Sequence, residues 1–184
     1  MLFKTERLLL REFSPDDFEG VHEYASDYEN VKHMAFGPNT PEDTRRYLEV
    51  QCREEREAIP RMHYNIAVEE ALLHKVIGGI SIHLNWRRDD GILGVIINRR
   101  YAGMGYSTEA LRGVIDHAFR DLDLHRVHAV VDVCNPAMIH VFEKLGLRCE
   151  GRMIKRGKSR PGADEPYFDQ FGFAVLREEW EARK

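Results

Sequence analysis

The chain has 184 residues, of which 43% are hydrophobic and 32% are charged, and its formal net charge is −4. This length is typical of one domain, so we expect a single domain over residues 1–184 with one hydrophobic core. The negative balance argues against nonspecific attraction to DNA or to an anionic membrane surface, which a basic chain would favour.

The three cysteines, Cys52, Cys134 and Cys149, are odd in number and show no C-x-x-C spacing. Neither a disulfide framework nor a cysteine zinc site is therefore indicated. Charged residues interrupt every apolar run at the N-terminus before it reaches the ~7 residues of a signal sequence. No stretch approaches the ~18 apolar residues of a membrane span. We expect a soluble protein of the cytoplasm.

The first half of the chain alternates strand-like and helix-like segments. Residues 7–13 are typical of a short strand. Ser14-Pro15-Asp16-Asp17 is typical of a helix start, because the hydroxyl caps free N–H groups and proline fits the first turn. Thr40-Pro41 begins a second, charged helix that runs to about Glu57. Three strand-like segments follow, at residues 64–69, 76–84 and 92–97.

In the second half of the chain, the spacing of the apolar residues changes. From Ser107, apolar residues recur at steps of three and four, which places them on one face of a helix. These residues are Leu111, Val114, Ile115, Ala118, Phe119 and Leu122. Residues 124–133 are strand-like, Asn135-Pro136 opens a helix that ends near Gly146, and residues 168–176 form a last strand. Strands separated by helices predict a mixed α/β sheet.

A glycine-rich segment lies between the strand at 92–97 and the following helix; it reads Arg100-Tyr101-Ala102-Gly103-Met104-Gly105-Tyr106-Ser107. Glycines let the backbone approach a ligand closely, and several N–H groups converge where the helix dipole favours negative charge. The segment indicates an anion site, to which Arg100 would add a charged donor. The alternative is a turn that only needs flexible residues. The segment is neither a P-loop nor a G-x-G-x-x-G motif.

Arg100-x-x-Gly103-x-Gly105 resembles the R/Q-x-x-G-x-G/A signature of the GCN5-related N-acetyltransferases, the GNAT superfamily. Three further segments match that superfamily's downstream spacings: Leu124 to Val127, Asn135-Pro136-Ala137 and Glu143 to Leu147. Residues 5–11 and 176–180 are similar to the branch of ribosomal-protein N-terminal acetyltransferases of the RimJ/RimL type. The resemblance covers nearly the whole chain. A nucleotide-binding α/β domain would leave these ordered matches unexplained.

The resemblance implies an α/β GNAT fold, in which a splayed mixed sheet carries helices on both faces. Where the fourth and fifth strands of that fold separate, the pantetheine arm of acetyl-CoA pairs with exposed main-chain groups. The implied acetyl-CoA residues form a strand edge, a glycine-rich loop and part of a later helix. They are Leu93, Val95, Ile96, Ile97 and Asn98; Arg100, Tyr101, Ala102, Gly103, Met104, Gly105, Tyr106 and Ser107; and Asn135, Phe142 and Lys144.

The resemblance also implies the reaction, in which a neutral primary amine attacks the thioester of acetyl-CoA directly, with Asn135 near the reactive end. The expected acceptor is a protein N-terminal α-amine, such as that of a ribosomal protein, or a small-molecule amine. An α-amine, with a reference pKa of ~8, demands less of a general base than the lysine side chain, with a reference pKa of ~10.4. A backbone N–H of Val95 or Ile96 is expected to stabilise charge on the thioester oxygen. The sequence leaves a homodimer open.

The chain departs from the family at two positions. Many GNAT enzymes carry a tyrosine seven residues after the asparagine, where this chain has Phe142. The RimJ/RimL branch often has a serine three residues after it, where this chain has Met138. Neither side chain can donate a proton to the departing thiolate. Water could serve instead, or the chain could be a noncatalytic acyl-CoA-binding module.

The general base has no obvious candidate on the splayed strand, because residues 92–97 contain no titratable side chain where family members often place a glutamate. His83, at the end of the preceding strand, is the first candidate, and Glu69 is the second. Either residue could instead be an ordinary polar residue at a strand end.

No metal is expected. His125 and His128 are three positions apart on a predicted strand, so they face opposite sides of it and cannot readily chelate one ion. Cys134 adjoins Asn135 and could lie near the thioester, although an unreactive buried thiol is the commoner case.

For two further features, the sequence allows both a binding role and a purely structural role. A run of basic residues suits a CoA phosphate, an acidic peptide or RNA, or else a solvated hairpin; it contains Arg152, Lys155, Arg156, Lys158 and Arg160. Tyr24, Tyr28, Phe36 and residues 33–39 fall where the family shapes its acceptor pocket, or else they pack the first helices together.

Overall fold

The structure is a computed structural model, in which residues 2–159 and 165–183 are described. One sheet forms its centre, with the strand order β1-β2-β3-β4-β5-β6-β8-β7. The strands are β1 (Leu2–Lys4), β2 (Leu8–Glu12), β3 (His63–Glu70), β4 (Lys75–Leu84), β5 (Asp90–Ile97), β6 (Arg126–Asp132), β7 (Arg148–Lys158) and β8 (Tyr167–Leu176). Only β5 and β6 pair in parallel among the described strands, so the predicted mixed sheet is confirmed.

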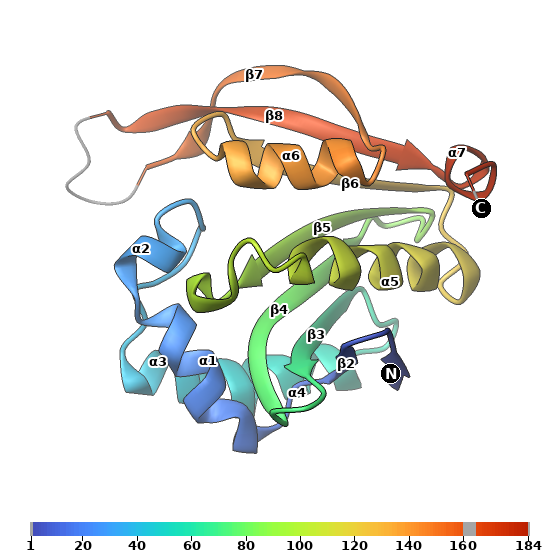
Figure 1. Cartoon of the computed structure of the whole chain (residues 1–184). Helices are drawn as coiled ribbons and strands as arrows, with labels where there is room; N and C mark the ends of the chain where they lie inside the picture. The colour runs from blue at the N-terminus through green and yellow to red at the C-terminus, as the bar shows by residue number, and fades with distance from the viewer. Residues whose placement is uncertain (1, 160–164, 184) are drawn as a thin grey trace.

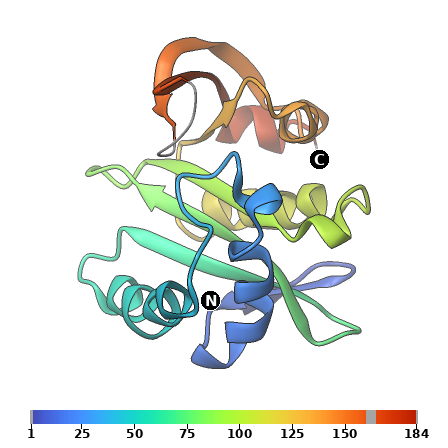
Figure 2. The same ribbon diagram turned by 90° about the vertical axis from the view of Figure 1, so that its left-hand side faces the viewer.

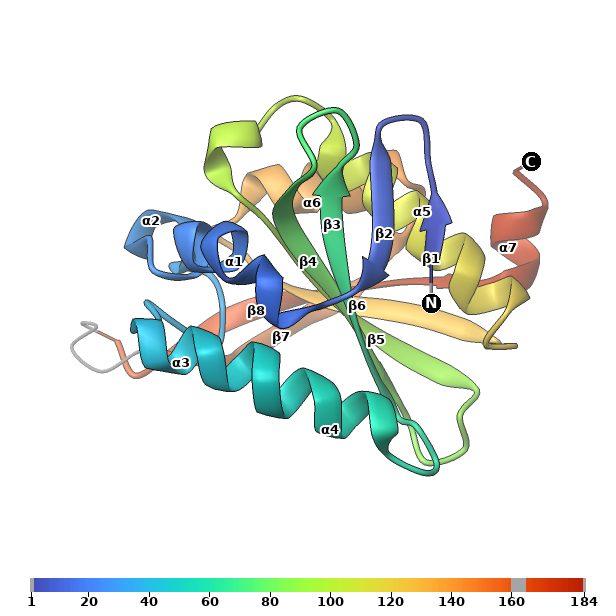
Figure 3. The ribbon, with the colours of Figure 1, turned by 90° about the horizontal axis from the view of Figure 1, so that it is seen from below.

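Helices cover both faces of this sheet (Figures 1 and 3). One face carries α1 (Phe18–Ala25), α2 (Tyr28–Val31), α3 (Pro41–Arg46) and α4 (Cys52–Glu57), and the other carries α5 (Tyr106–Arg120) and α6 (Pro136–Lys144). A last helix, α7 (Arg177–Glu181), follows β8. Each face has its own apolar core. Five of the six residues predicted for the apolar stripe of α5 are buried, and Leu122 packs against them from just beyond the helix.

Both helix starts predicted in the first half of the chain are present. Ser14 caps the short turn η1 (Pro15–Asp17), which leads directly into α1. Thr40 accepts a hydrogen bond from the Asp43 N–H, and the Asp43 carboxylate accepts one in return from the Thr40 N–H. The helix that begins there continues to Glu57, as predicted, but it passes through a π-helical segment, η2 (Tyr47–Gln51), between α3 and α4.

The sheet splits into two halves beyond the middle of β5 (Figure 1). The parallel ladder between β5 and β6 runs only from the Asp90–Arg126 pair to the Leu93–Ala129 pair. Past it, β5 stays paired with β4 as far as Ile97, and β6 stays paired with β8 as far as Asp132. The gap between residues 94–97 and residues 130–132 is called the opening below. It is the predicted splay.

The strand β1 and the helices α2 and α7 have no counterpart among the predicted elements. The strand β7 lies where a solvated hairpin was one of the explanations for the basic run. It forms an exposed hairpin strand with β8, interrupted by two irregularities in register. The predicted basic residues lie here: Arg152 pairs with Asp169, and Arg156 donates to Gln170. Arg160 lies outside the described residues. Within the described part of the chain, no helix combines the length and the apolar character needed to cross a bilayer.

Candidate active site

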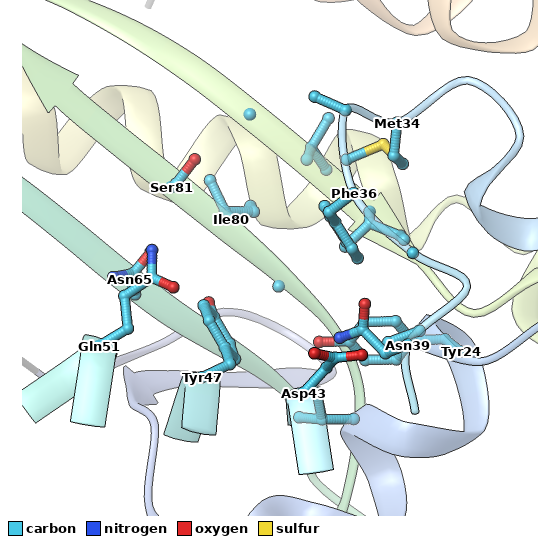
Figure 4. Close-up of a pocket in the computed structure, with 18 of the residues that line it drawn as sticks. Tyr24, Met34, Phe36, Asn39, Asp43, Tyr47, Gln51, Asn65, Ile80 and Ser81 are labelled. Atoms are coloured by element: carbon cyan, nitrogen blue, oxygen red, sulfur yellow. The ribbon is translucent and has the colours of Figure 1, made fainter. Parts of the chain in front are cut away.

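A cavity of about 700 Å³ lies between the α1–α4 layer and the sheet (Figure 4). Figure 4 shows Met34 and Phe36 on one side of it and Gln51, Asn65 and Ser81 on the other. The floor includes Gly94, Val95 and Ile96 of β5, which are the residues that have lost β6 as a neighbour. The cavity therefore adjoins the opening.

Of the residues predicted to shape an acceptor pocket, some line the cavity and others do not. Residues 34–39 line the cavity, and so does Tyr24, which at 3% exposure also belongs to the core packed around α1. Tyr28 is 59% exposed and lies outside the cavity lining. Tyr24 thus both lines the cavity and packs in the core around α1, and its contact with the acceptor stays a prediction.

The exposed main-chain groups of β5 can be assigned from the alternation of its hydrogen bonds. The Asn98 N–H donates to the Ile77 carbonyl of β4, and the Asp90 carbonyl accepts from Asn85, just past β4. In an antiparallel strand the N–H and C=O of one residue point to the same side, and successive residues alternate. Val95 and Ile97 therefore face the opening, whereas Ile96 faces β4. Of the two N–H groups expected near the thioester oxygen, only that of Val95 has the correct direction.

The glycine-rich loop joins β5 to α5. After the short turn η3 (Arg99–Tyr101), Gly103 and Gly105 both adopt left-handed backbone angles, with φ of +76° and +82°. A methyl group built on Gly103 would meet no heavy atom within 4 Å, so a ligand can come close to the backbone there. Gly105 caps α5 without any side-chain hydrogen bond. The unpaired N–H groups of the first turn, which begins with Tyr106 and Ser107, are the usual binding site for an anion.

Arg100 lies beside this loop, but its side chain is paired elsewhere. Its Nη1 donates to the Glu23 carboxylate of α1 over 2.7 Å, and the side chain is 75% exposed. Glu23 also accepts from Lys75, and this bond is the main reason that the pKa of Glu23 lies below its usual range. The predicted phosphate contact therefore requires Arg100 to exchange partners. Asn98 is 3% exposed and caps η3, so it shapes the turn.

An ion pair from the N-terminus supports the loop from behind. Arg7 donates from Nε to Glu109 over 2.7 Å and from Nη1 to the Met104 carbonyl over 2.9 Å. Burial raises the pKa of Glu109, but hydrogen bonds from Thr5 and from Arg7 outweigh it and leave the pKa lowered. The first turn of α5 is thus tied to the segment that precedes β2.

The far side of the opening is formed by the end of β6 and the start of α6. The side-chain oxygen of Asn135 accepts from the Met138 N–H over 3.2 Å and so caps α6. Phe142, predicted to line the CoA tail, is 2% exposed, and its ring packs 5.4 Å from that of Phe173 in the core. It supports this wall from inside. Lys144, at the end of α6, is exposed, and so is Cys134, contrary to the buried thiol that is commoner.

His83 lines the cavity. Its ring lies 4.5 Å from that of His63. Burial first, and the His63 ring second, lower the pKa of His83, while the Glu55 carboxylate opposes them. Glu55 also lines the cavity and accepts hydrogen bonds from His63 and Asn65. A lowered pKa keeps His83 neutral, and hence able to accept a proton, at neutral pH.

Glu69, the second candidate for the base, is part of a buried ion pair instead. Arg11 donates to Glu69 from Nε and to Asp17 from both Nη atoms, and the Glu69 side chain is 10% exposed. Glu69 is not among the residues that line the cavity. Its role is to hold β2 against β3.

One pair of residues that sequence reasoning missed joins the loop after α2 to the β6 side of the opening. Nδ1 of His33, in the loop after α2, lies 2.8 Å from Oδ2 of Asp132, the last residue of β6. The other Asp132 oxygen accepts from the Cys134 N–H over 2.8 Å. No sequence signal predicts this pair, because 99 positions separate its members. Over residues 2–159 and 165–183, no three His, Cys, Asp or Glu side chains are placed to hold a metal ion.

The sequence and the structure resemble known acetyltransferases. A family model described as "Acetyltransferase (GNAT) domain" matches residues 7–148. The uncharacterized N-acetyltransferase YnaD of Bacillus subtilis (strain 168) is 28% identical over 182 residues, with 98% of this chain and 99% of YnaD covered. A crystal structure of a GNAT-family acetyltransferase from Bacillus anthracis is 30% identical and has a TM-score of 0.84, with 97% of this chain and 100% of that chain covered.

Two more distant structures share the fold at 20% identity. The ribosomal-protein-S5-alanine acetyltransferase from Vibrio fischeri has a TM-score of 0.80, with 98% of each chain covered. The spermidine N-acetyltransferase from Vibrio cholerae, solved in complex with CoA and spermine, has a TM-score of 0.81, with 96% of this chain and 99% of that chain covered. At this identity the likeness establishes the fold.

Proposed function

The chain belongs to the GNAT acetyltransferase family and is an N-acetyltransferase, and on that premise we propose that it transfers an acetyl group from acetyl-CoA to a primary amine held in the cavity beside the opening. One observation carries the proposal. Gly94, Val95 and Ile96 belong both to the floor of the cavity and to the stretch of β5 that β6 leaves unpaired. The two substrates can therefore meet at one strand.

The path for acetyl-CoA runs along the opening. The main-chain groups of Val95 and Ile97 would pair with the pantetheine arm, as a neighbouring strand would. The diphosphate would lie against the loop at Gly103 and Gly105 and the first turn of α5, where an uncovered backbone and a helix dipole favour it. Arg100 would leave Glu23 to join it. Asn135 and α6 would form the opposite wall.

The amine would attack from the cavity side. An ammonium ion must first lose a proton, and His83 is the cavity residue whose lowered pKa suits it to receive one. Attack places negative charge on the thioester oxygen, and the Val95 N–H points into the opening where it can stabilise that charge. Because the relatives are acetyltransferases, the alternative of a noncatalytic acyl-CoA-binding module is the weaker one.

We propose a small-molecule amine or a protein N-terminal α-amine as the acceptor. The spermidine enzyme and the ribosomal-protein enzyme that share this fold illustrate the two classes. A cavity of about 700 Å³ suits a molecule of a few hundred daltons or the first residues of a peptide. The single sheet that includes strands from Leu2 to Leu176 supports treating residues 1–184 as one catalytic domain.

The test is acetyl transfer to a panel of amines, followed by mass spectrometry. The panel should contain polyamines, amino-acid amides and N-terminal peptides of ribosomal proteins, each with acetyl-CoA and the purified chain. The expected result is one acceptor class acetylated by the wild type and far more slowly by the His83→Gln variant. Tight CoA binding without any acetylated product across the panel would contradict the proposal.

A further inference from the structure

The residues predicted from the family leave the proton donor for the departing CoA thiolate unassigned. Met138 packs against the core with a thioether side chain, and Phe142 is buried. We propose that His33, oriented by Asp132, carries the proton of the attacking amine to the CoA sulfur. This inference rests on the acetyl transfer proposed above.

The His33–Asp132 pair has the geometry of an oriented acid–base group. Nδ1 and Oδ2 are 2.8 Å apart, and the exposed fractions of the two side chains are 24% and 13%. An ionised carboxylate only accepts hydrogen bonds, so Nδ1 carries the hydrogen of this bond. Nε2 of the neutral ring is then the basic nitrogen. A carboxylate that fixes the tautomer of a catalytic imidazole in this way is a recurring arrangement in acyl transfer.

The pair also lies in the right place. Asp132 is three residues beyond Ala129, the last β6 residue that pairs with β5, so it lies ~10 Å further along the edge of the opening. The Asp132 carbonyl accepts from the Asn135 N–H, which ties it to the turn expected near the thioester. His33 is not itself among the residues that line the cavity, but the adjacent Met34 is, so His33 lies at the edge of the cavity, between it and β6. In Figures 1 and 2 the segment around α2 rises from the α1 layer toward the half of the sheet that holds β6 and β8.

Two other His–Asp pairs of similar geometry lack this placement. His117 bonds to Asp121 over 2.7 Å, but both lie at the end of α5. His128 bonds to Asp90 over 2.6 Å, where β5 and β6 are still paired. Among the His–Asp pairs of the described residues, the pair formed by His33 joins the loop after α2 to Asp132, at the β6 side of the opening.

In the proposed step, His33 carries the second of the two protons that the acceptor ammonium loses. The acceptor ammonium first gives one proton to His83, which releases it to solvent. As the neutral amine forms the C–N bond, its nitrogen becomes positively charged, and Nε2 of His33 takes the second proton. The resulting imidazolium, stabilised by Asp132, delivers that proton to sulfur as the C–S bond breaks. The products are the amide, the thiol of CoA and one proton released to solvent, so atoms and charge balance.

The test uses steady-state kinetics on the acceptor identified by the panel, with His33→Gln and Asp132→Asn as variants. Because a general acid–base group contributes roughly 10² to 10⁴-fold, kcat is expected to fall at least ~100-fold in His33→Gln. KM for acetyl-CoA is expected to stay within about twofold. Asp132→Asn, which changes a positioning residue, should lower kcat with an unchanged KM. His117→Gln removes the same type of hydrogen bond and should leave kcat unchanged.

Chemical rescue distinguishes proton transfer from a structural role. Added imidazole should restore a large part of kcat to His33→Ala and none to His83→Gln. A kcat of His33→Gln within threefold of the wild type would overturn the inference. So would a loss of activity in His33→Ala that imidazole does not restore, or a loss of CoA binding in all three variants at the pair. A wild type that acetylates no amine would instead refute the proposed function.

Discussion

Nη1 of Arg100 donates a hydrogen bond of 2.7 Å to Oε1 of Glu23, which joins the glycine-rich loop to α1. The same carboxylate holds Lys75 from β4. An arginine whose side chain is 75% exposed can turn from this partner toward a diphosphate at little cost, because exposed ion pairs contribute at most about 1 kcal/mol. If Arg100 binds the diphosphate as proposed, Glu23 competes with CoA for its side chain.

Replacing Arg100 should weaken CoA binding moderately. A charge-assisted hydrogen bond contributes about 1.5–3 kcal/mol, and breaking the bond to Glu23 offsets part of it, so Arg100→Ala is expected to raise the Kd for CoA about threefold to tenfold. Isothermal titration calorimetry measures this change. The neighbouring Arg99, which pairs with Asp27, provides the control, since Arg99→Ala should leave the Kd unchanged.

Replacing Gly103 should affect binding more than stability. Its φ of +76° costs alanine about 1–2 kcal/mol, or roughly 2–8 °C in Tm, but no neighbouring atom obstructs a methyl group. The methyl group would fill the space next to the backbone that the diphosphate needs, so Gly103→Ala should raise the Kd for CoA more than tenfold. Gly151→Ala, also at positive φ but on β7, should lower Tm without changing the Kd. Equal Kd values for the two variants would argue against the loop as the phosphate site.

Asn135 offers a way to separate its structural and cofactor roles. Asn135→Ala removes the cap of α6 and should lower the free energy of unfolding by about 1 kcal/mol. Asn135→Asp keeps an equally good cap, so its Tm should match that of the wild type. If Asn135 lies near the thioester, the added negative charge should nevertheless lower kcat/KM severalfold. Thermal unfolding and initial rates on both variants check these expectations, and wild-type rates in Asn135→Asp would leave Asn135 with a capping role alone.

Glu109 should make stability depend on pH. Because its pKa is lowered in the folded chain, its interactions stabilise the fold fully above the ordinary glutamate pKa, and this contribution disappears as pH falls through the lowered value. Glu109→Gln is expected to lose about 1–2 kcal/mol at pH 7, a figure discounted for the partly exposed Arg7. Urea unfolding should show this difference shrinking toward zero below pH ~4. A difference that stays constant from pH 7 to pH 3 would show that charge plays no part.

The sequence predicted those parts of the fold that local patterns determine. The apolar stripe of α5 and the caps at Ser14 and Thr40 are short-range signals, and the corresponding helices are present. The strand β7 was anticipated only as one explanation of its basic run, because nearly all of its residues are exposed, which leaves no apolar alternation, and because two irregularities in register interrupt it. Strand propensity and apolar alternation both reflect the burial of one face of a strand, so neither predicts an exposed edge strand well.

For the candidate site, the sequence predicted contiguous segments, namely the glycine-rich loop and residues 33–39, of which residues 34–39 line the cavity; that the loop binds acetyl-CoA stays a prediction. The glycine-rich loop is contiguous in sequence, so its residues could be named together. By contrast, Arg7 meets Glu109 across 102 positions, and the cavity lining comes from helices and strands of the whole first half of the chain. Such contacts depend on how elements pack. The direction of the Val95 N–H likewise required the hydrogen-bond pattern of β5 with β4.

The π-helical segment Tyr47–Gln51 accommodates one residue more than a regular helical turn would. Tyr47 and Gln51 both line the cavity proposed to hold the amine. Deleting a single codon there would rotate the whole of α4 by about 100° and carry Glu55 away, while the strands proposed to bind the coenzyme would stay unchanged. Descendants of this chain could thus change which amines they accept by gaining or losing one amino acid.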